Sequence, residues 1–239
     1  MAAFSVCNAY AQPWLKRLQQ DRAIAVLRVS EVSLGQKLAE CVIAGGLSII
    51  EITWNSEQPT RLIAWLRERF PQCWIGTGTL LTAQDLQEAI ACGCQFGFTP
   101  HLEPSMVARA VAAEFPLIPG ALTPTEIVTS WQLGASSVKV FPVQAVGGQD
   151  YIQALQGPLG QIPLIPTGGV TLDNAAQFLQ AGAIAVGLSG QLFPKTFIQQ
   201  QNWSAIQTQA QQLKQRIQPF CHHRGESQGE LQTFSDLKN

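Results

Sequence analysis

Short apolar runs alternate with longer amphipathic stretches along most of this chain. The apolar runs are rich in Val, Ile, Leu and Ala and are bounded by Gly, Pro or polar residues, which is typical of strands buried in a parallel sheet. We expect eight such strands, at residues 23–27, 47–52, 73–77, 94–98, 115–118, 138–141, 164–166 and 183–188. The stretches between them have helical spacing, as in Leu62, Ile63 and Leu66 after Pro59.

Capping signals mark the beginnings of two predicted helices. Thr82 is followed by Asp85, and Thr123 by Glu126, at the spacing of a capping box. Pro124 occupies the first helical position after Thr123, where proline is favoured. Glu126 is therefore assigned a structural role. Further helices are expected near residues 13–20, 31–44, 103–113 and 202–217, and from residue 173 onward.

Eight strands alternating with eight helices through short loops predict an α/β fold, a (β/α)8 TIM barrel with a short N-terminal helix. A doubly wound open sheet is the competing architecture, but no G-x-G-x-x-G follows the first strand. With 239 residues, 46% of them hydrophobic, the chain can bury one substantial core. We expect one barrel domain over residues 1–217 and a polar C-terminal tail over 218–239.

Composition argues against several functional classes. Charged residues make up 13% of the chain and the net charge is −1, so there is no electrostatic footprint for nucleic acid. No stretch approaches the roughly 18 apolar residues of a membrane span. The first cation is Lys16, so Ala9-Tyr10-Ala11 lacks the basic region of a secretory signal, and we expect a cytoplasmic protein.

The six cysteines include no C-x-x-C pair, and most lie within apolar segments. We interpret them as small core residues of a protein in a reducing compartment, not as a disulfide framework or zinc site. They are Cys7, Cys41, Cys73, Cys92, Cys94 and Cys221. His222 and His223 lie in the polar tail without neighbouring ligands, so no metal site is expected there.

Isolated polar residues stand at the carboxyl ends of the predicted strands. Catalytic groups of a barrel gather at these ends, so we expect the residues to share one mouth. They are Arg28, Glu51, Thr79, Thr99, Lys139, Thr167 and Ser189.

Lys139 interrupts the apolar strand 138–141 and is the first candidate for chemistry. Burial depresses the pKa of a lysine, and a neutral amine can attack a carbonyl to form a Schiff base. The alternative is a lysine whose ammonium reaches water at the strand end. Glu51 breaks a second apolar run and is a candidate general acid/base. Its alternative is a structural ion pair with Lys139 or Arg28. Together the amine and carboxylate supply what aldol cleavage through a Schiff base requires.

Glycines at the last two strand ends suggest a phosphorylated substrate. Gly168 and Gly169 precede a predicted helix, and Gly187 and Ser189 end the last strand. Backbone N–H groups in such loops can approach an anion, and loops after strands 7 and 8 are the recurrent phosphate site of this fold. Arg28 could hold a carboxylate bidentately at the other end, or could balance Glu51.

Taken in order, these motifs resemble the 2-keto-3-deoxy-6-phosphogluconate (KDPG) aldolases, a family that includes 4-hydroxy-2-oxoglutarate aldolase activity. The resemblance covers about residues 15–215. It is carried by Glu51-Ile52-Thr53, Gly76-Thr77-Gly78-Thr79-Leu80, Thr99-Pro100, Pro119-Gly120, Thr123-Pro124-Thr125-Glu126, Lys139-Val140-Phe141-Pro142 and Pro166-Thr167-Gly168-Gly169.

The resemblance implies a class I aldolase of carbohydrate metabolism, in the Entner–Doudoroff route, that splits its substrate into pyruvate and glyceraldehyde 3-phosphate. Cleavage of 4-hydroxy-2-oxoglutarate to pyruvate and glyoxylate is a further implied activity. It also implies a homotrimer without metal or organic cofactor. Lys139 would form the Schiff base and Glu51 would be the general acid/base. The implied substrate-binding residues are Arg28, Asn55, Thr79, Pro100, Thr167, Gly168, Gly169, Gly187 and Ser189.

The chain departs from the gluconate-type pattern at Asn55, where those enzymes often carry an arginine that grips the substrate carboxylate. Asn55-Ser56, Arg28 and Thr99-Pro100 resemble the 6-phosphogalactonate-type relatives instead, so both epimers stay open as substrates. We hypothesise that Arg28 takes over carboxylate binding. Two other classes also stay open: a phosphosugar isomerase or epimerase barrel without a Schiff base, and a non-catalytic phosphosugar-binding protein. No role is assigned to His101.

Overall fold

The computed structural model describes residues 9–221. Nine strands lie in this part of the chain: β1 (Ala23–Leu27), β2 (Ile49–Thr53), β3 (Trp74–Gly78), β4 (Gly97–Phe98), β5 (Leu117–Ile118), β6 (Gly120–Ala121), β7 (Val138–Val140), β8 (Leu164–Pro166) and β9 (Val186–Leu188).

Ten α-helices accompany the strands within the same residues: α1 (Gln12–Asp21), α2 (Val32–Ala44), α3 (Pro59–Arg69), α4 (Ala83–Ala91), α5 (Pro104–Ala112), α6 (Pro124–Gln132), α7 (Gln149–Leu159), α8 (Ala175–Gln180), α9 (Lys195–Gln199) and α10 (Trp203–Ile217). Three short 3-10 helices are η1 (Ala9–Ala11), η2 (Val143–Val146) and η3 (Gln218–Phe220). In this part of the chain, no helix is both long and apolar enough to cross a membrane.

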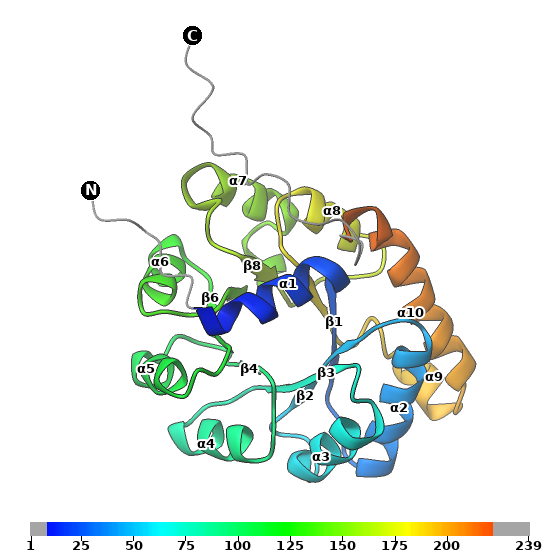
Figure 1. Ribbon diagram of the computed structural model, residues 1–239. Coiled ribbons are helices and arrows are strands. Elements are labelled where there is room, and N and C mark those ends of the chain that lie inside the picture. Colours follow the sequence, from blue (N-terminus) through cyan, green and yellow to red (C-terminus); the bar gives the residue numbers. More distant parts are fainter. Residues whose placement is uncertain (1–8, 222–239) are drawn as a thin grey trace.

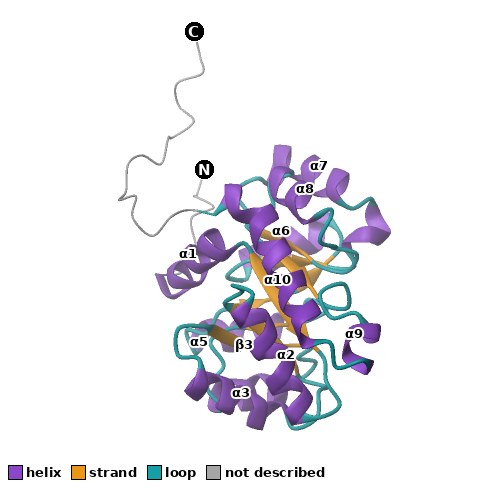
Figure 2. Cartoon of the chain, turned by 90° about the vertical axis from the view of Figure 1, so that its right-hand side faces the viewer, coloured by secondary structure: helices purple, strands orange, loops and turns teal. Residues whose placement is uncertain are grey.

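The strands form a curled parallel sheet with helices around it (Figures 1 and 2). Strand pairing divides it into a six-stranded part, in the order β5-β4-β3-β2-β1-β9, and a three-stranded part, β6-β7-β8. A single parallel bridge between Thr167 and Gly187 links β8 to β9. The predicted α/β class is confirmed, whereas the barrel expected as one continuous sheet is divided into two.

The division falls at Pro119, which separates β5 from β6; the predicted strand 115–118 contains β5, and β6 was not predicted. β5 pairs with β4, and β6 pairs with β7 through Gly120 opposite Lys139. Proline has no backbone N–H and cannot donate to a ladder, so a strand that contains it is interrupted. The Pro119 carbonyl still accepts a 2.9 Å hydrogen bond from the Lys139 backbone N–H, which keeps β7 beside this segment.

Side chains alternate between the two faces of each strand, and the alternation separates the buried apolar residues into two clusters. Ala23, Ala25 and Leu27 of β1 belong to the larger cluster, which packs the sheet against the helices. The smaller cluster lies inside the curl of the sheet and contains Trp14, Leu18, Ile24, Val26, Ile49, Phe96, Phe98, Ile118, Ile165 and Ala185. We call this smaller cluster the apolar plug. It fills the inside of the sheet, and the polar residues on the inner face follow it along the strands.

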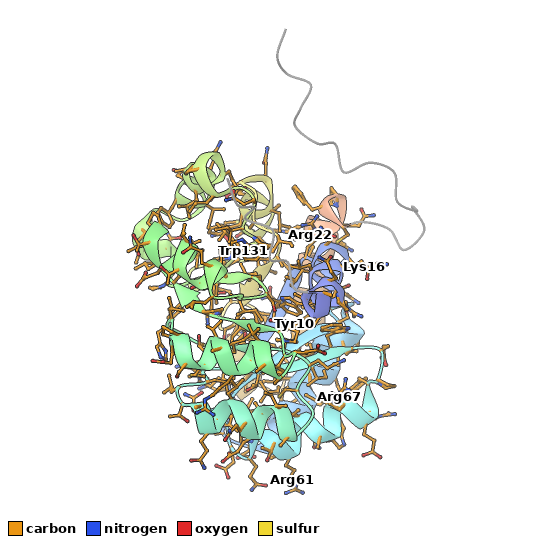
Figure 3. The ribbon with its side chains drawn as sticks, turned by 60° about the vertical axis from the view of Figure 1, so that its left-hand side comes forward. Tyr10, Lys16, Arg22, Arg61, Arg67 and Trp131 are labelled. Atoms are coloured by element: carbon orange, nitrogen blue, oxygen red, sulfur yellow. The ribbon has the colours of Figure 1, made fainter. Side chains whose placement is uncertain are left out.

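The predicted N-terminal helix is confirmed as α1, which crosses the beginnings of the strands (Figure 1). Trp14 is completely buried, stacks on Phe96 at 4.6 Å, and donates a 3.1 Å hydrogen bond to the Ser137 hydroxyl. Figure 3 shows Tyr10 and Arg22 at opposite ends of this helix. The Tyr10 hydroxyl donates to the Gly134 carbonyl, and Arg22 donates to the carbonyls of Ile184 and Phe220. α1 thus closes one end of the sheet.

Both predicted capping boxes are confirmed at the beginnings of α4 and α6. The Glu126 carboxylate accepts hydrogen bonds from the backbone N–H groups of Leu122 and Thr123, so its assigned structural role is confirmed. The tail was expected from residue 218, but η3 continues the folded part through Phe220. His222, His223, Cys7 and the remainder of the expected tail lie outside the described residues.

Candidate active site

A cavity of about 370 Å³ opens at the carboxyl ends of the strands. It is lined by Val26, Arg28, Glu51, Thr53, Thr79, Pro100, Lys139, Phe141, Thr167, Gly168, Gly169, Val170, Gly187, Ser189, Gly190 and Gln191.

All but two of the residues predicted for the site or its shared mouth line this cavity. One exception is Asn55, which is exposed in the turn after β2 and is not among the lining residues. Thr99 is also outside the lining set; its hydroxyl donates a 2.5 Å hydrogen bond to the His101 carbonyl. His101 itself is exposed. The shared mouth expected from the strand ends is therefore present, while the role of each residue in it stays a prediction.

Lys139 and Glu51 enter the cavity because of strand alternation. Val138 and Val140 pack outward against the helices, so Lys139 between them points to the inner face. In β2, Ile49 belongs to the inner cluster, and Glu51, two residues further on, shares its face. The exposed fractions are 7% for Lys139 and 3% for Glu51.

Burial pushes both groups toward their uncharged forms. It lowers the pKa of Lys139, an effect that Glu51 opposes and Arg28 reinforces. Burial also raises the pKa of the Glu51 carboxyl, while Lys139 and Arg28 lower it. The two side chains do not form a direct ion pair within 4.0 Å. The cavity thus holds an amine that can lose its proton and a carboxyl that can carry one.

Aromatic rings flank the lysine amine. Its Nζ lies 4.8 Å from the centroid of the Phe141 ring and 5.7 Å from that of Phe98. Phe98 belongs to the apolar plug beneath the cavity, and Phe141 is 36% exposed at its wall. Ring faces stabilise an ammonium weakly compared with water. They therefore maintain the dry surroundings that favour a neutral amine.

Gly78, at the end of β3, supports the Glu51 carboxylate, and the sequence alone did not reveal it. A Cβ at Gly78 would lie 1.7 Å from Glu51 Oε1 and 2.5 Å from its Cδ. The carboxylate consequently rests against bare backbone of the neighbouring strand. The sequence did contain a signal for this contact, the Gly-Thr-Gly segment directly before Thr79, but we interpreted it only as part of a family motif.

Thr79 has a backbone φ of +63°, in the left-handed region that a β-branched residue rarely occupies. Hydrogen bonds hold the chain on both sides of it. The Gly78 carbonyl accepts from the Trp54 N–H at 2.7 Å, and the Leu80 N–H donates to the Phe98 carbonyl at 3.2 Å. Such a conformation costs about 1–3 kcal/mol and persists where surrounding structure enforces it. The strain therefore lies at a residue that lines the cavity.

Ser56, not Asn55, organises the loop beside Arg28. The buried Ser56 hydroxyl accepts a 3.2 Å hydrogen bond from the Val29 N–H and lies 3.1 Å from the Thr53 hydroxyl. The Val29 carbonyl accepts from the Glu57 N–H at 3.0 Å. These bonds fasten the residue after Arg28 to the turn that follows β2. The exposed Arg28 side chain is thereby held at the cavity rim.

The glycine loop after β8 has the backbone freedom expected of it, with φ of +82° at Gly168 and +101° at Gly169. The helix that was expected to follow from residue 173 begins later, at Ala175. Asn174 occupies the turn instead, and its amide donates to the Gly169 carbonyl. The loop backbone, not a helix end, therefore lies next to the cavity. Within residues 9–221 no three His, Cys, Asp or Glu side chains are grouped to hold a metal ion.

A family model described as KDPG and KHG aldolase matches residues 15–209. The chain belongs to the KDPG and KHG aldolase family. The resemblance expected from its motifs is confirmed, as is the prediction of an enzyme, since aldolases are carbon–carbon lyases.

Three members show how close this similarity is. The 2-dehydro-3-deoxy-phosphogluconate aldolase of Haemophilus influenzae is 34% identical, over 82% of this chain and 92% of that protein. The KDPG aldolase of Legionella pneumophila, solved with pyruvate captured as a covalent carbinolamine intermediate, is 27% identical. It has a TM-score of 0.76 and covers 82% of this chain and 95% of that one. A structure described as native KDPGal is 30% identical, with a TM-score of 0.75 and coverages of 83% and 95%.

Proposed function

We propose that this aldolase cleaves 2-keto-3-deoxy-6-phosphogluconate to pyruvate and glyceraldehyde 3-phosphate through a Schiff base on Lys139. One observation carries the proposal: a buried amine of lowered pKa and a buried carboxyl of raised pKa line the same cavity. The covalent carbinolamine described for the Legionella relative is the first adduct that this route forms.

The proposed steps follow from these two groups. The lone pair of neutral Lys139 Nζ attacks the C2 carbonyl of the keto acid, and the carbinolamine loses water to give an iminium. Glu51 takes the proton of the C4 hydroxyl, the C3–C4 bond breaks, and its electrons move into the iminium. The aldehyde leaves and an enamine stays on the lysine. Protonation of the enamine carbon by Glu51 and hydrolysis of the iminium release pyruvate and restore the amine.

The other residues of the cavity bind the two ends of the substrate. Backbone N–H groups near Gly168, Gly169, Gly187 and Ser189 bind the phosphate. At the opposite end Arg28 binds the carboxylate, and Thr79, Pro100 and Thr167 surround the pyruvate portion. Asn55 is left out of this set because its side chain does not line the cavity. The reaction requires no metal or organic cofactor.

Borohydride reduction in the presence of pyruvate tests the mechanism. We expect a stable mass gain, located by peptide mapping on Lys139, and no gain in a Lys139→Arg control, because a guanidinium is not an amine nucleophile. If the protein cleaves the substrate but forms no adduct on Lys139, the Schiff-base proposal is wrong. Turnover of a phosphorylated aldose or ketose without trapping would indicate an isomerase, and pyruvate binding with neither trapping nor turnover would indicate a binding protein.

The galactonate epimer is the second candidate substrate. Similarity to the native KDPGal structure and Arg28 at the cavity rim both favour it. Kinetics with both epimeric phosphorylated keto acids and with 4-hydroxy-2-oxoglutarate, measured side by side, decide the preference. A kcat/KM higher for the galactonate epimer would replace the gluconate assignment.

The two parts of the sheet are proposed to make one closed eight-stranded (β/α)8 barrel within a single domain spanning residues 1–217. The Thr167–Gly187 bridge and the hydrogen bond from the Ile184 N–H to the Leu164 carbonyl support closure on one side. On the other side the Ser136 N–H donates to the Leu117 carbonyl, so β5 and β6 act as one strand interrupted at Pro119.

The family resemblance also motivates a homotrimer that acts in the cytoplasm, in the Entner–Doudoroff route. Leu81, which is 55% exposed at the turn before α4, is one apolar side chain available for such contacts. Light scattering should give a mass three times that of the 25.9 kDa chain. A monomer at micromolar concentration would contradict the trimer, and fractionation of cells would test the compartment.

A further inference from the structure

Two cysteines meet at the end of α4, on the side of the sheet where the strands begin. The Sγ atoms of Cys92 and Cys94 lie 3.8 Å apart, within hydrogen-bond distance for sulfur. Cys94 is buried and Cys92 is half-buried. The sequence pattern led us to treat both as simple core residues, since no C-x-x-C is present. The C-x-C spacing nevertheless brings the sulfurs together.

The turn that joins these cysteines holds them in place. Gly93 has a φ of +87°, and a Cβ there would meet nothing within 4 Å, so the turn is open to solvent. The Gly93 N–H donates to the Ile90 carbonyl and the Cys94 N–H to the Ala89 carbonyl, which is the usual way a helix ends at a left-handed glycine. Both thiols are thus anchored to the last turn of α4.

We propose that Cys92 and Cys94 form a redox site that reacts with a hydroperoxide and closes a reversible disulfide. Residues two apart in a chain have Cα atoms at most about 7 Å apart, close to the range that a disulfide spans. The sulfurs need to approach by less than 2 Å from 3.8 Å to reach a bond of about 2.05 Å. Glycine between them lets the backbone adjust.

The chemistry balances with peroxide as the oxidant. The Cys92 thiolate attacks one peroxide oxygen, the O–O bond breaks, and the departing hydroxide takes up a proton to become water. Cys92 is then a sulfenic acid. The Cys94 sulfur attacks the Cys92 sulfur, the S–O bond breaks, and a second water leaves as the disulfide forms. Overall the two thiols lose two protons and two electrons, and the peroxide is reduced to two waters.

The surroundings favour Cys92 as the attacking thiol. The hydrogen bond between the two sulfurs lowers the pKa of Cys92 to about 7. Burial, the 3.2 Å hydrogen bond from the Cys92 S–H to the Ala89 carbonyl and the C-terminal end of α4 oppose the thiolate. The hydrogen bond between the sulfurs, together with burial, raises the pKa of Cys94, which Arg67 partly offsets. Figure 3 shows Arg67 among the outer helices. By contrast, burial raises the pKa of Cys41 and of Cys73, so those thiols resist oxidation.

This site lies away from the cavity. Cys94 precedes β4, and Pro100, which lines the cavity, follows that strand. Oxidation should therefore change aldolase turnover by less than about twofold, as expected for distant, independent sites. A disulfide closing so small a ring is strained and readily reduced, which makes the reaction reversible.

The test uses the full chain with Cys73→Ser, because the tryptic peptide of residues 70–109 then holds only Cys92 and Cys94. After treatment with hydrogen peroxide, we expect this peptide to lose the mass of two hydrogens and resist alkylation, and dithiothreitol should restore it. Adding Cys94→Ser should leave a sulfenic acid on Cys92 that dimedone traps. Cys41→Ser, which removes a buried thiol of raised pKa, is the matched control and should leave the disulfide unchanged.

Three results would overturn the proposal. The peptide could retain two alkylatable thiols after peroxide treatment at a dose that oxidises free cysteine. Dimedone could fail to label Cys92 in the Cys94→Ser variant. Cys92→Ser could consume peroxide as fast as the parent chain. A circular dichroism spectrum of each variant confirms that the comparison concerns folded protein, and none of these readouts depends on aldolase activity.

Discussion

Gly78→Ala offers the sharpest test of how the cavity positions its acid/base. The added methyl would lie 1.7 Å from Glu51 Oε1, whereas real Cβ atoms essentially never approach a heavy atom within 3.0 Å. The carboxylate must therefore move by at least the difference, 1.3 Å. Gly78 is not in the left-handed region, so the substitution acts through this contact and not through backbone strain.

A displacement of this size has a predictable cost. Misplacing a catalytic group by 1 Å can cost about 10²-fold in rate, and removing a general acid/base costs roughly 10²–10⁴-fold. We expect Gly78→Ala to lower kcat about 100-fold and to lose about 1–3 kcal/mol of stability through overpacking. Pyruvate should still become trapped on Lys139, more slowly, because the amine is untouched.

The assay is pyruvate release, with a thermal melt of each variant. The matched control is Gly157→Ala, at an exposed position of α7 where a Cβ meets nothing within 4 Å. Alanine is favoured over glycine within a helix, but the position before Pro158 disfavours helical backbone for any residue with a Cβ. These effects oppose each other, so we expect the free energy of unfolding to change by less than about 1 kcal/mol and the activity to be unchanged. If the methyl acts through Glu51, Gly78→Ala combined with Glu51→Gln should be no slower than Glu51→Gln alone. A folded Gly78→Ala protein within a few-fold of wild-type kcat would refute the reasoning.

Four further predictions concern the charged groups of the cavity. Lys139→Arg should abolish turnover while circular dichroism stays unchanged, and near-normal cleavage would disprove the mechanism. Arg28→Ala should raise KM more than it lowers kcat; an unchanged KM would remove Arg28 from carboxylate binding. Glu51→Gln should slow cleavage by roughly 10²–10⁴-fold. Burial raises the pKa of Glu51 above its ordinary value of 4.5. Between 4.5 and this raised pKa the folded protein keeps a proton on Glu51 that the unfolded chain has lost. The free energy of unfolding of the wild-type protein therefore falls as pH rises from 4.5 through the raised pKa. Urea unfolding at several pH values should show no such fall for Glu51→Gln.

The order of elements could be predicted from the sequence because it depends on local signals. The strands at 23–27 and 164–166 have the predicted bounds, and the Thr82 and Thr123 capping boxes begin α4 and α6 as expected. Hydrophobic period and capping act within a few residues and need no tertiary contact. The helices α7 and α9 were not individually predicted, since their polar, glycine-containing or short segments carry weaker patterns.

The meeting of Lys139 and Glu51 in one cavity was also predictable. A parallel sheet brings the carboxyl ends of its strands to one edge, and the period of two places both side chains on the inner face. Asn55 was misplaced for a different reason. It lies in a turn, where no period indicates which side chain points inward, and the structure buries its neighbour Ser56 instead.

By itself, the sequence determined the α/β class, the succession of strands and helices, and which polar residues stand at the strand ends. Only the tertiary structure decided that the sheet divides at Pro119, that bare backbone at Gly78 supports Glu51, and that Cys92 and Cys94 lie within 3.8 Å. The first group depends on interactions within a few residues. The second depends on register and close approach between segments, which no local pattern encodes.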